Sequence, residues 1–438
     1  MSMRNKKRKT RRFGEMMIRS TAVLLAGICL FGCQNSQEGK EDTVTAPVKI
    51  PITFIVDSST GKKNEEKVVE EFNEAYKGVC EADVEWIMET ENDYRQNLKR
   101  QNVTDKLPAV ITDLRMLPSF YQMMITEKRI EDLSPYIYGD EEWKNLIEPV
   151  VLEGCSEPDG KIYLAPLSTA AFSCSGIFWN EELFARAGIQ EFPETWEEFW
   201  ECCDQLMAQG ITPLALHTDG TAWAPMLLAT AELADTREGM EFMKELYPES
   251  YQNENGLHLA ETLQRLFLYT TEDAIHNDFD VAYNNFFSGG AAMIPNGYWM
   301  MDQIPDGWKE KVRFSAFPGN KLISSPETFG WSLVSAYGED VKEAVLAFFK
   351  FRTALNKQEK DELFSRSMAQ LSSTAEGDYI RAYQNEPQIV PNYQVKWNSI
   401  FQEEVLGQTL PELISGKISA NEFVQMADES IRQFREEQ

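Results

Sequence analysis

The feature of this sequence that most constrains its fold is an alternation of short apolar strands with amphipathic helices, which begins at Lys49. KIPITFIV (49–56), ADVEWIM (82–88) and LPAVITDL (107–114) have the apolar and β-branched character that predicts strands. Between the first two, residues 64–78 repeat apolar side chains at helical spacing. Strands that alternate with helices predict an α/β fold with a mainly parallel sheet.

Local signals further along extend this pattern. Additional strands are expected at Ala165–Ser168, Gly176–Trp179 and Ile211–His217. Asn180 is predicted to cap a short helix that stops at Gly188, and Thr195 and Glu198 have the spacing of a capping box, which predicts the start of another helix. Residues 339–353, EDVKEAVLAFFKFRT, predict a strongly amphipathic helix.

In parallel α/β sheets, ligands bind beyond the carboxyl ends of the strands, so polar residues there are candidates for a site. Asp57 and Ser59 follow the first predicted strand, and Asp113 and Arg115 follow the third. Asp57 and Asp113 are equally suited to cap the helices that come next, because a carboxylate accepts hydrogen bonds from free helix N–H groups. The sequence leaves both roles open.

A basic stretch and an uncharged segment, Ser20–Gly32, precede a cysteine near the N-terminus. The segment is shorter than the roughly 20 apolar residues that a membrane-spanning helix needs. This order predicts a secretion signal over residues 1–32. Leu30–Cys33 resembles a bacterial lipobox, which implies cleavage before Cys33 and attachment of lipid to it. The polar residues 33–47 are predicted to form a flexible tether.

Length and charge narrow the possible partners. Roughly 390 residues follow the tether, which is too long for one ordinary core and favours two lobes. The predicted signal contains 8 of the 42 basic and 1 of the 70 acidic side chains, which leaves 34 basic against 69 acidic ones. Nucleic acid is therefore excluded as a partner, since binding to it needs cations that meet phosphates.

Neither the cysteines nor the histidines predict a metal site. No C-x-x-C pair occurs, and the odd number of cysteines in the folded part indicates no disulfide framework, so buried thiols are expected, with one disulfide left open. These five are Cys80, Cys155, Cys174, Cys202 and Cys203. The histidines, His217, His258 and His276, are far apart and show no ligand or nucleophile spacing. No catalytic group, metal or cofactor is predicted.

Four parts of the chain, in this order, resemble motifs of bacterial extracellular solute-binding proteins, the family that includes maltose-type binding proteins. They are DGKIYLAPLST (159–169), GIFWNEELFARAGIQEFPETWEEF (176–199), FFSGGAAMIPNGYW (286–299) and FPG…FGWSLVS…EDVKEAVLAFFKF (317–351). The resemblance covers essentially the whole mature chain. It departs from the family where Tyr298 replaces a proline and Trp331 replaces a glycine.

The resemblance implies a two-lobed fold of the type II periplasmic-binding-protein kind, with a mainly parallel sheet flanked by helices in each lobe and a hinged cleft between them. Lobe one is expected at 48–164 plus about 313–355, and lobe two at 165–312 plus about 356–438. It also implies that an ABC importer's transmembrane permease subunits receive the ligand. We expect a monomer, held by lipid at the outer face of the cytoplasmic membrane.

Sugars present an apolar ring face and a rim of hydroxyls, so a sugar site needs flat aromatic rings and planar polar groups. Trp223, Trp299 and Trp331 fall in turns next to helix or strand starts and are candidates, with Tyr298 beside them. The resemblance places Trp299 at the family's cleft tryptophan. By contrast, four tryptophans lie within strand or helix patterns and are predicted to be structural: Trp86, Trp179, Trp196 and Trp200.

Four polar candidates complete the predicted site. Asn296 suits either a ligand hydroxyl or the turn itself. Ser168 and Thr169 lie where the resemblance places the first crossing between lobes. Arg366 follows the second hinge and suits either the cleft or a salt bridge.

The sequence thus predicts a lipid-anchored protein that binds a carbohydrate, an oligosaccharide in particular, and catalyses no reaction. Three alternatives stay open at this point. The same fold would serve a non-sugar solute, such as a peptide, a polyol or a metal complex. A surface glycoside hydrolase and a receptor that feeds a membrane sensor are the others.

Overall fold

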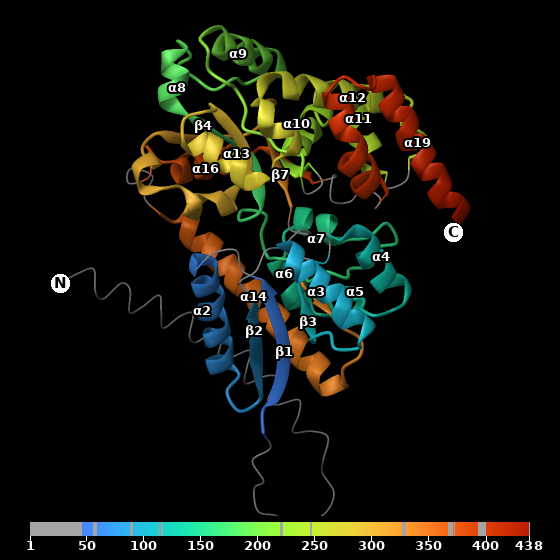
Figure 1. Ribbon diagram of the computed structural model, residues 1–438. Coiled ribbons are helices and arrows are strands. Elements are labelled where there is room, and N and C mark those ends of the chain that lie inside the picture. Colours follow the sequence, from blue (N-terminus) through green and yellow to red (C-terminus); the bar gives the residue numbers. More distant parts are fainter. Residues whose placement is uncertain are drawn as a thin grey trace, which may run out of the picture. The chain divides into compact units, whose positions relative to one another are not determined.

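The structure, a computed structural model, divides by its internal contacts into two compact units (Figure 1). It describes residues 46–55, 59–87, 91–112, 114, 117–219, 222–245, 248–325, 330–366, 371, 373–392 and 400–437. Unit 1 holds the described residues up to Thr112, with Lys128–Glu131 and Trp331–Arg352; unit 2 holds Asp113–Glu127, Asp132–Gly330 and Thr353–Gln438. Residues 132–164 and 313–330 group with unit 2, and the lobe boundaries given by the resemblance stay a prediction.

Unit 1 is built on a four-stranded sheet in the order β2-β1-β3-β8. Its strands are β1 (Val48–Ile55), β2 (Cys80–Ile87), β3 (Val110–Ile111) and β8 (Ser332–Leu333). β1 is parallel to β2 and to β3, whereas β8 is antiparallel to β3. The first three predicted strands and the mainly parallel sheet are therefore confirmed in unit 1.

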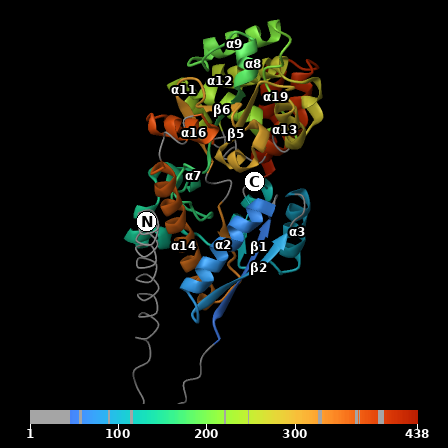
Figure 2. The ribbon, with the colours of Figure 1, turned by 90° about the vertical axis from the view of Figure 1, so that its left-hand side faces the viewer.

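Helices cover both faces of this sheet. Figure 2 shows α2 (Ser59–Ala75) and α14 (Glu339–Phe364) on one side and α3 (Glu91–Val103) on the other. Phe72 of α2 and Phe348 of α14 are both buried, with ring centroids 5.0 Å apart. The amphipathic helix predicted from residue 339 is thus confirmed, and its apolar side closes the core of unit 1.

Unit 2 contains a mixed five-stranded sheet, and here the expected mainly parallel arrangement is corrected. β4 (Cys174–Asn180) is antiparallel to β5 (Met293–Gly297), β6 (Val312–Ser315) and β7 (Lys321–Ser324). β7 is parallel to β9 (Gln388–Pro391). The reason is that β4 begins at the end of the sheet where β5, β7 and β9 finish. β4 therefore runs opposite to its neighbours, although strands and helices alternate along the sequence.

Capping signals in the sequence set two helix starts of unit 2 as predicted. The Asn180 side chain accepts hydrogen bonds from the N–H groups of Glu182 and Leu183 and starts α8 (Glu181–Arg186). Thr195 and Glu198 form the capping box of α9 (Trp196–Ala208). These bonds satisfy N–H groups that a helix start otherwise leaves free.

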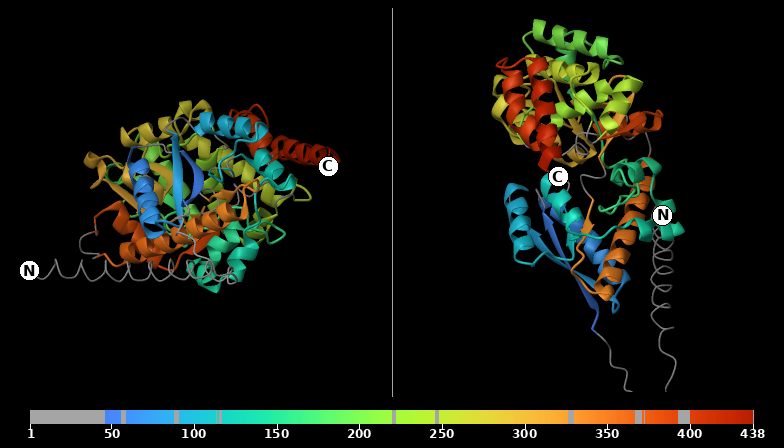
Figure 3. Two further views of the ribbon diagram at one scale, coloured as in Figure 1. Left: turned by 90° about the horizontal axis from the view of Figure 1, so that it is seen from below. Right: turned by 90° about the vertical axis from the view of Figure 1, so that its right-hand side faces the viewer.

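The other helices of unit 2 surround its sheet, with α10 packed on β5 and β7 and α16 packed on β6. Figure 3 shows α19, the helix that ends at the C-terminus, beside the other helices of this unit. These elements are α4 (Pro118–Thr126), α5 (Ser134–Gly139), α6 (Glu141–Leu146), α7 (Pro149–Cys155), α10 (Trp223–Leu233), α11 (Arg237–Lys244), α12 (Glu254–Leu266), α13 (Phe279–Phe287), α16 (Ala375–Gln384), α18 (Leu410–Ile414) and α19 (Ala420–Glu437). Shorter helical turns are η2 (Phe267–Tyr269), η3 (Glu272–His276), η4 (Tyr298–Gln303), η5 (Asp306–Trp308) and the π-helical η7 (Phe401–Thr409).

Two predicted strands do not form as expected. Residues 165–168 are irregular, in keeping with Pro166, which has no backbone N–H to donate to a ladder. Residues 211–217 contribute only isolated bridges from Leu214, one of them parallel to Met293 of β5. The first segment carries Ser168 of the predicted site, and Leu214 joins the second to β5.

The five cysteines of the folded part are free and buried, as predicted, and none of them is paired in a disulfide. Burial raises the pKa of the Cys80 thiol to about 11 and that of Cys202 to about 12, so these thiols stay protonated at neutral pH. None of the helices in the described part of the chain has both the length and the apolar character needed to cross a membrane. The apolar segment before Cys33 lies outside the described residues.

Candidate functional site

The carboxyl ends of three strands meet at one end of the sheet in unit 2. Ser175 of β4 pairs with Gly297, the last residue of β5, and Cys174 pairs with Ser324, the last residue of β7. Ser324 pairs in turn with Pro391 at the end of β9. We call the residues gathered there the strand-end region, defined as 168–175, 296–299, 324–325 and 391–392. Such a place is where α/β sheets bind their ligands.

Buried polar atoms without partners concentrate in the strand-end region. Four side-chain oxygens there have no hydrogen-bond partner among the residues that the structure describes: the hydroxyls of Ser173, Ser175 and Ser324 and the amide oxygen of Asn392. An unpaired buried polar group costs about 1–3 kcal/mol, so native proteins normally supply a partner. Ordered water would supply it here, or the hydroxyls of a ligand once the surrounding side chains move apart.

The end of β5 positions the predicted residues Asn296 and Trp299. Asn296 is completely buried, and its side-chain oxygen accepts the N–H of Gly297 at 2.8 Å, which is the turn-forming role that the sequence had left open. A Cβ on Gly297 would lie 2.1 Å from the half-buried ring of Trp299. Glycine is therefore needed for this ring to lie against the backbone, and Trp299 is held at the strand-end region.

Tyr298 and the predicted site residue Arg366 both contact the carboxylate of Glu376. The Tyr298 hydroxyl donates to Glu376 of α16 at 3.0 Å, and Arg366 donates to both oxygens of Glu376 at 2.8 Å. The Tyr298 ring lies 5.4 Å from Phe172, between ring centroids. Burial and then the Glu376 charge raise the pKa of Tyr298, so its hydroxyl stays a donor. The salt bridge that the sequence had allowed for Arg366 is thus present.

Ser168 and Thr169 are buried, and protein groups occupy their hydroxyls. Ser168 donates to Asn356 at 2.8 Å. Thr169 donates to Glu148 at 2.8 Å and accepts the N–H of Ala171 at 3.1 Å. These bonds anchor the segment that leads into β4, and contact of either hydroxyl with a ligand stays a prediction.

Glu148 collects donors from several segments around Thr169. Its carboxylate accepts the Ala170 N–H at 2.9 Å and the Tyr383 hydroxyl at 3.2 Å, and it pairs with Lys360 of α14. Burial raises the pKa of Glu148, but the bonds from Lys360, Ala170 and Thr169 together lower it below its ordinary value. A charged Glu148 therefore holds the start of the strand-end region in place.

Trp223 stands next to the strand-end region through His217. His217 follows three residues after Leu214, which forms an isolated parallel bridge with Met293 of β5. Trp223, the first residue of α10, has its ring 5.1 Å from the His217 ring.

His217 itself is buried, with 1% of its surface exposed. Its Nδ1 lies 3.1 Å from the carbonyl oxygen of Asp219, and because a carbonyl only accepts, we assign the hydrogen to Nδ1. Nε2 is then an acceptor, and it has no partner in the described part of the chain. Burial lowers the pKa of His217 to about 4, which keeps the ring neutral at physiological pH.

The remaining predicted residues are placed elsewhere or are not described. Trp331 belongs to the core of unit 1, where Phe348 lies 5.8 Å away and Arg352 covers the ring at 4.1 Å. This packing accounts for its burial, and ligand contact by Trp331 stays a prediction. Ser59 begins α2, and its side chain is not among those described. Cys33, Asp57, Asp113 and Arg115 lie outside the described residues.

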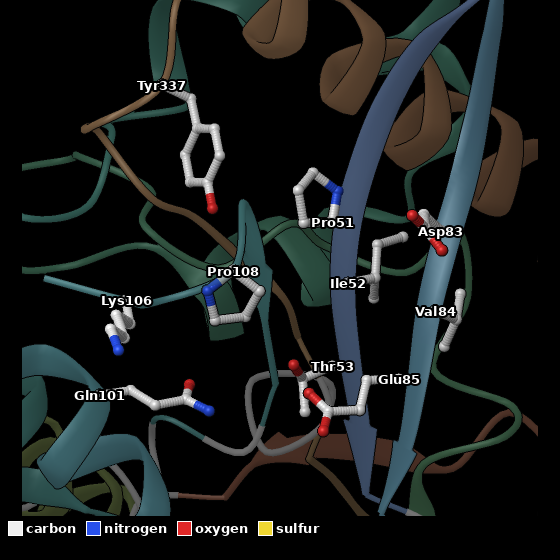
Figure 4. Close-up of a pocket in the computed structure, with 10 residues that line it drawn as sticks. All are labelled: Pro51, Ile52, Thr53, Asp83, Val84, Glu85, Gln101, Lys106, Pro108 and Tyr337. Carbon is white, nitrogen blue, oxygen red and sulfur yellow. The ribbon is translucent and has the colours of Figure 1, made fainter.

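Unit 1 has a pocket of its own, about 360 Å³ in volume, on its sheet (Figure 4). Figure 4 shows Thr53, Glu85 and Gln101 toward one end and Tyr337 at the other. The other lining residues are Pro51, Ile52, Asp83, Val84, Lys106 and Pro108. The pocket lies along the middle of β1 and β2 rather than at their carboxyl ends, and none of the predicted residues with described side chains lines it. We therefore place the candidate site in unit 2.

Sequence reasoning missed Glu376, Phe172 and the unpaired serines. Glu376 lies in a helix and Phe172 in an irregular loop, and neither belongs to a sequence motif that would mark it as a binding residue. Ser324 ends a strand that was not predicted, so the rule that selected Asp57 was not applied to it. Among the described residues, His, Cys, Asp and Glu side chains form no group of three suited to a metal ion.

Comparison with known proteins identifies the family. Residues 67–373 match the family described as bacterial extracellular solute-binding proteins, which is most of the chain. The multiple sugar-binding protein of Streptococcus mutans serotype c is 28% identical over 217 residues, or 46% of this chain and 49% of that protein. The chain thus spans about half the length of the curated relative that it matches.

Solved structures share the fold. A chitin oligosaccharide binding protein has a TM-score of 0.68 and 21% identity, with 88% of this chain and 98% of that chain covered. A Streptococcus pneumoniae solute-binding protein in complex with the blood group A-trisaccharide has a TM-score of 0.66 and 19% identity, with 88% and 100% covered. At these identities the likeness shows the fold alone, which is the predicted two-lobed α/β fold. Together with the family match, it shows that this chain belongs to the bacterial extracellular solute-binding protein family.

Proposed function

We propose that this protein captures a carbohydrate, in particular an oligosaccharide, outside the cytoplasmic membrane and delivers it to the permease of an ABC importer. The observation that carries the proposal is the strand-end region of unit 2, where unpaired hydroxyls and an amide oxygen lie near aromatic rings. Sugars need both kinds of group, since the ring face is weakly apolar and the rim carries hydroxyls.

The polar half of this region suits hydroxyl ligands better than ions. The unpaired atoms of Ser173, Ser175, Ser324 and Asn392 are all uncharged. The charged groups described at its border are already paired, Glu376 with Arg366 and Glu148 with Lys360. A neutral ligand with many donors and acceptors would satisfy the hydroxyls without separating either ion pair.

The aromatic half gives such a ligand its apolar contact. Phe172, Tyr298 and Trp299 are all half-buried, so each ring keeps some open surface. The relatives support the same ligand class by name, since they include a multiple sugar-binding protein and a chitin oligosaccharide binding protein. A peptide or a metal complex is not favoured by any group found at the strand-end region, and a polyol would use the hydroxyls but has no ring face for the aromatic side chains.

Capture is proposed to work by a shift between conformations. In a two-lobed protein, a ligand that contacts both lobes stabilises a closed form, and the permease would recognise that form. We propose that the chain is attached to the membrane through lipid on Cys33 and acts as a monomer. Binding without turnover is expected, because transport requires the ligand to leave unchanged.

The test is a thermal-shift panel of mono- and oligosaccharides against the mature protein. A ligand at 100 times its dissociation constant stabilises the folded state by about 2.7 kcal/mol, which raises the melting temperature measurably. Stabilisation by members of one sugar class is expected. The carbohydrate proposal is wrong if no sugar, pure or in a glycan digest, raises the melting temperature. Release of reducing sugar during long incubation would instead point to a hydrolase.

A further inference from the structure

Helix α13 carries a repeat that the proposed site does not use. Along Phe279–Ser288, an aromatic residue is followed directly by a polar one at every fourth position. The pairs are Phe279–Asp280, Tyr283–Asn284 and Phe287–Ser288. Residues four apart lie on the same side of a helix, about 6 Å apart along its axis. The repeat therefore makes two parallel rows, one aromatic and one polar.

The aromatic row stands at the border between core and solvent. Phe279, Tyr283 and Phe287 are each half-buried, whereas Ala282 and Phe286 on the inner side of the helix are fully buried. The ring centroids of Phe279 and Tyr283 are 6.0 Å apart, and those of Tyr283 and Phe287 are 4.5 Å apart. The inner residues fix the helix to the core, so the three rings are left partly open.

Two tryptophans extend the row at its ends. Trp223 lies 5.4 Å from Phe279, and Trp308 lies 5.7 Å from Phe287, between ring centroids. Both tryptophans are half-buried. We call the five residues the α13 strip: Trp223, Phe279, Tyr283, Phe287 and Trp308. All five lie in unit 2.

The polar row gives the strip a rim of hydrogen-bonding groups. Asp280, Asn284 and Ser288 are all exposed. A carboxylate, an amide and a hydroxyl offer both acceptors and donors to sugar hydroxyls. The only strongly cationic contact described on the strip is Lys311, 5.9 Å from the Trp308 ring centroid. This composition suits a neutral, hydroxyl-rich chain better than an acidic one.

The strip begins where the candidate site ends. Trp223 contacts His217, whose segment is joined to β5 by the parallel bridge of Leu214 with Met293, and β5 ends in the strand-end region. A glycan with one end at the strand-end region would reach the strip at Trp223, and its next units can lie along the ring series from there. Each unit would set its apolar face on a ring and its hydroxyls against the polar row.

We propose that the α13 strip is an extended binding surface for the further units of a glycan chain, so that the protein selects oligosaccharides of several units over mono- and disaccharides. This inference rests on the proposed function and specifies its substrate class. An aromatic row that served packing alone would make affinity independent of chain length.

The experiment is calorimetric titration of the mature protein with three graded series: malto-, xylo- and chito-oligosaccharides of two to six units. In the series that binds, affinity is expected to rise with each added unit until the strip is filled. Phe287→Leu, which keeps an apolar side chain for packing, should weaken the longest ligands about tenfold and leave the disaccharide unchanged. Asn284→Ala should act in the same direction on long ligands only.

Matched controls separate the strip from general damage. Tyr138, an aromatic residue of unit 2 that is 46% exposed and lies on α5, is replaced in Tyr138→Leu and should leave every affinity unchanged. The melting temperature of each variant without ligand shows that it folds. Equal affinity for the disaccharide and the hexasaccharide, or an equal loss for both in Phe287→Leu, would overturn the strip while solute capture stands. Binding of no member of any series, together with no thermal stabilisation by any other sugar or glycan digest, would overturn both proposals.

Discussion

Tyr298 and Arg366 bind the same carboxylate, that of Glu376, from two different segments of unit 2. Tyr298 follows β5 directly, and Arg366 follows the end of α14. The shared anion therefore fixes the orientation of the Tyr298 ring beside Phe172, at the place where three strands end.

The hydroxyl and the ring of Tyr298 are expected to have separable roles. Tyr298→Phe removes one bond to a charged acceptor and should lower the free energy of unfolding by about 1–2 kcal/mol, while affinity for the best sugar falls only a few-fold. Tyr298→Ala also removes the ring and should abolish most of the affinity. Urea unfolding and calorimetric titration measure the two effects. Similar affinities for both variants would show that the ring makes no ligand contact.

Gly297→Ala should displace the ring of Trp299, because the new Cβ would lie 2.1 Å from it. We expect about a tenfold loss of sugar affinity with the fold retained, since the ring can move without moving the backbone. Gly139→Ala is the matched control, because a Cβ there meets no atom within 4 Å. Unchanged affinity in Gly297→Ala, measured by titration, would remove Trp299 from the site.

Lys360→Met tests the ionic anchor of the segment that leads into β4. The lowered pKa of Glu148 means that its contribution to stability is present above its unfolded pKa and is lost as pH falls through the folded pKa. The variant should be less stable than the wild type by about 1–2 kcal/mol at pH 7, with the difference shrinking in acid. Chemical denaturation of the variant and the wild type, at pH 7 and in acid, measures this difference in the free energy of unfolding.

Lys357→Met provides the control on the same helix. Lys357 pairs with Asp361, and these side chains are 43% and 64% exposed. Its replacement should change stability by no more than about 0.5 kcal/mol. If the two variants lose the same free energy of unfolding, the Glu148–Lys360 pair stabilises the fold no more than the exposed Lys357–Asp361 pair does.

Acid should destabilise the protein through His217. Its pKa is about 4 in the folded state, below its unfolded value, so the unfolded state takes up the proton first as pH falls. The free energy of unfolding should decrease between about pH 6.5 and pH 4, by about 3 kcal/mol in total from this group. His217→Gln should flatten that part of the pH profile.

Cys33→Ala should move the protein from the membrane fraction to the medium or the soluble fraction. The prediction follows from the lipobox-like Leu30–Cys33, since a buried acyl chain contributes about 0.8 kcal/mol per methylene to membrane attachment. Fractionation followed by immunoblotting measures the distribution. Protein that stays in the membrane fraction after the replacement would show that Cys33 is not the anchor.

The sequence predicted those parts of the molecule that depend on neighbours in the chain. Helix caps at Asn180 and Thr195 were readable because the capping bonds join residues two or three apart. Trp179, Trp196 and Trp200 were predicted to be structural from their strand and helix patterns, and all three are buried. The turn after β5 was found through a family motif that covers Asn296 and Trp299.

What the sequence missed depends on pairings between distant segments. No pattern tells that Ser175 ends up opposite Gly297, or that Glu148 meets Lys360, because such contacts arise from the order of strands in the sheet. The antiparallel direction of β4 was missed for the same reason. Trp331 was a candidate for the site because it falls in a turn. Its burial could not be predicted, because Arg352 and Phe348, which cover its ring, come from a later helix.

The unpaired hydroxyls of Ser173, Ser175 and Ser324 affect which sugars this protein would reject. A serine hydroxyl rotates and either donates or accepts, so it tolerates a sugar hydroxyl in more than one configuration. It offers nothing to a carbon-bound hydrogen, and a buried hydroxyl left unpaired costs about 1–3 kcal/mol. Discrimination at the strand-end region would therefore act against deoxy sugars more strongly than between epimers.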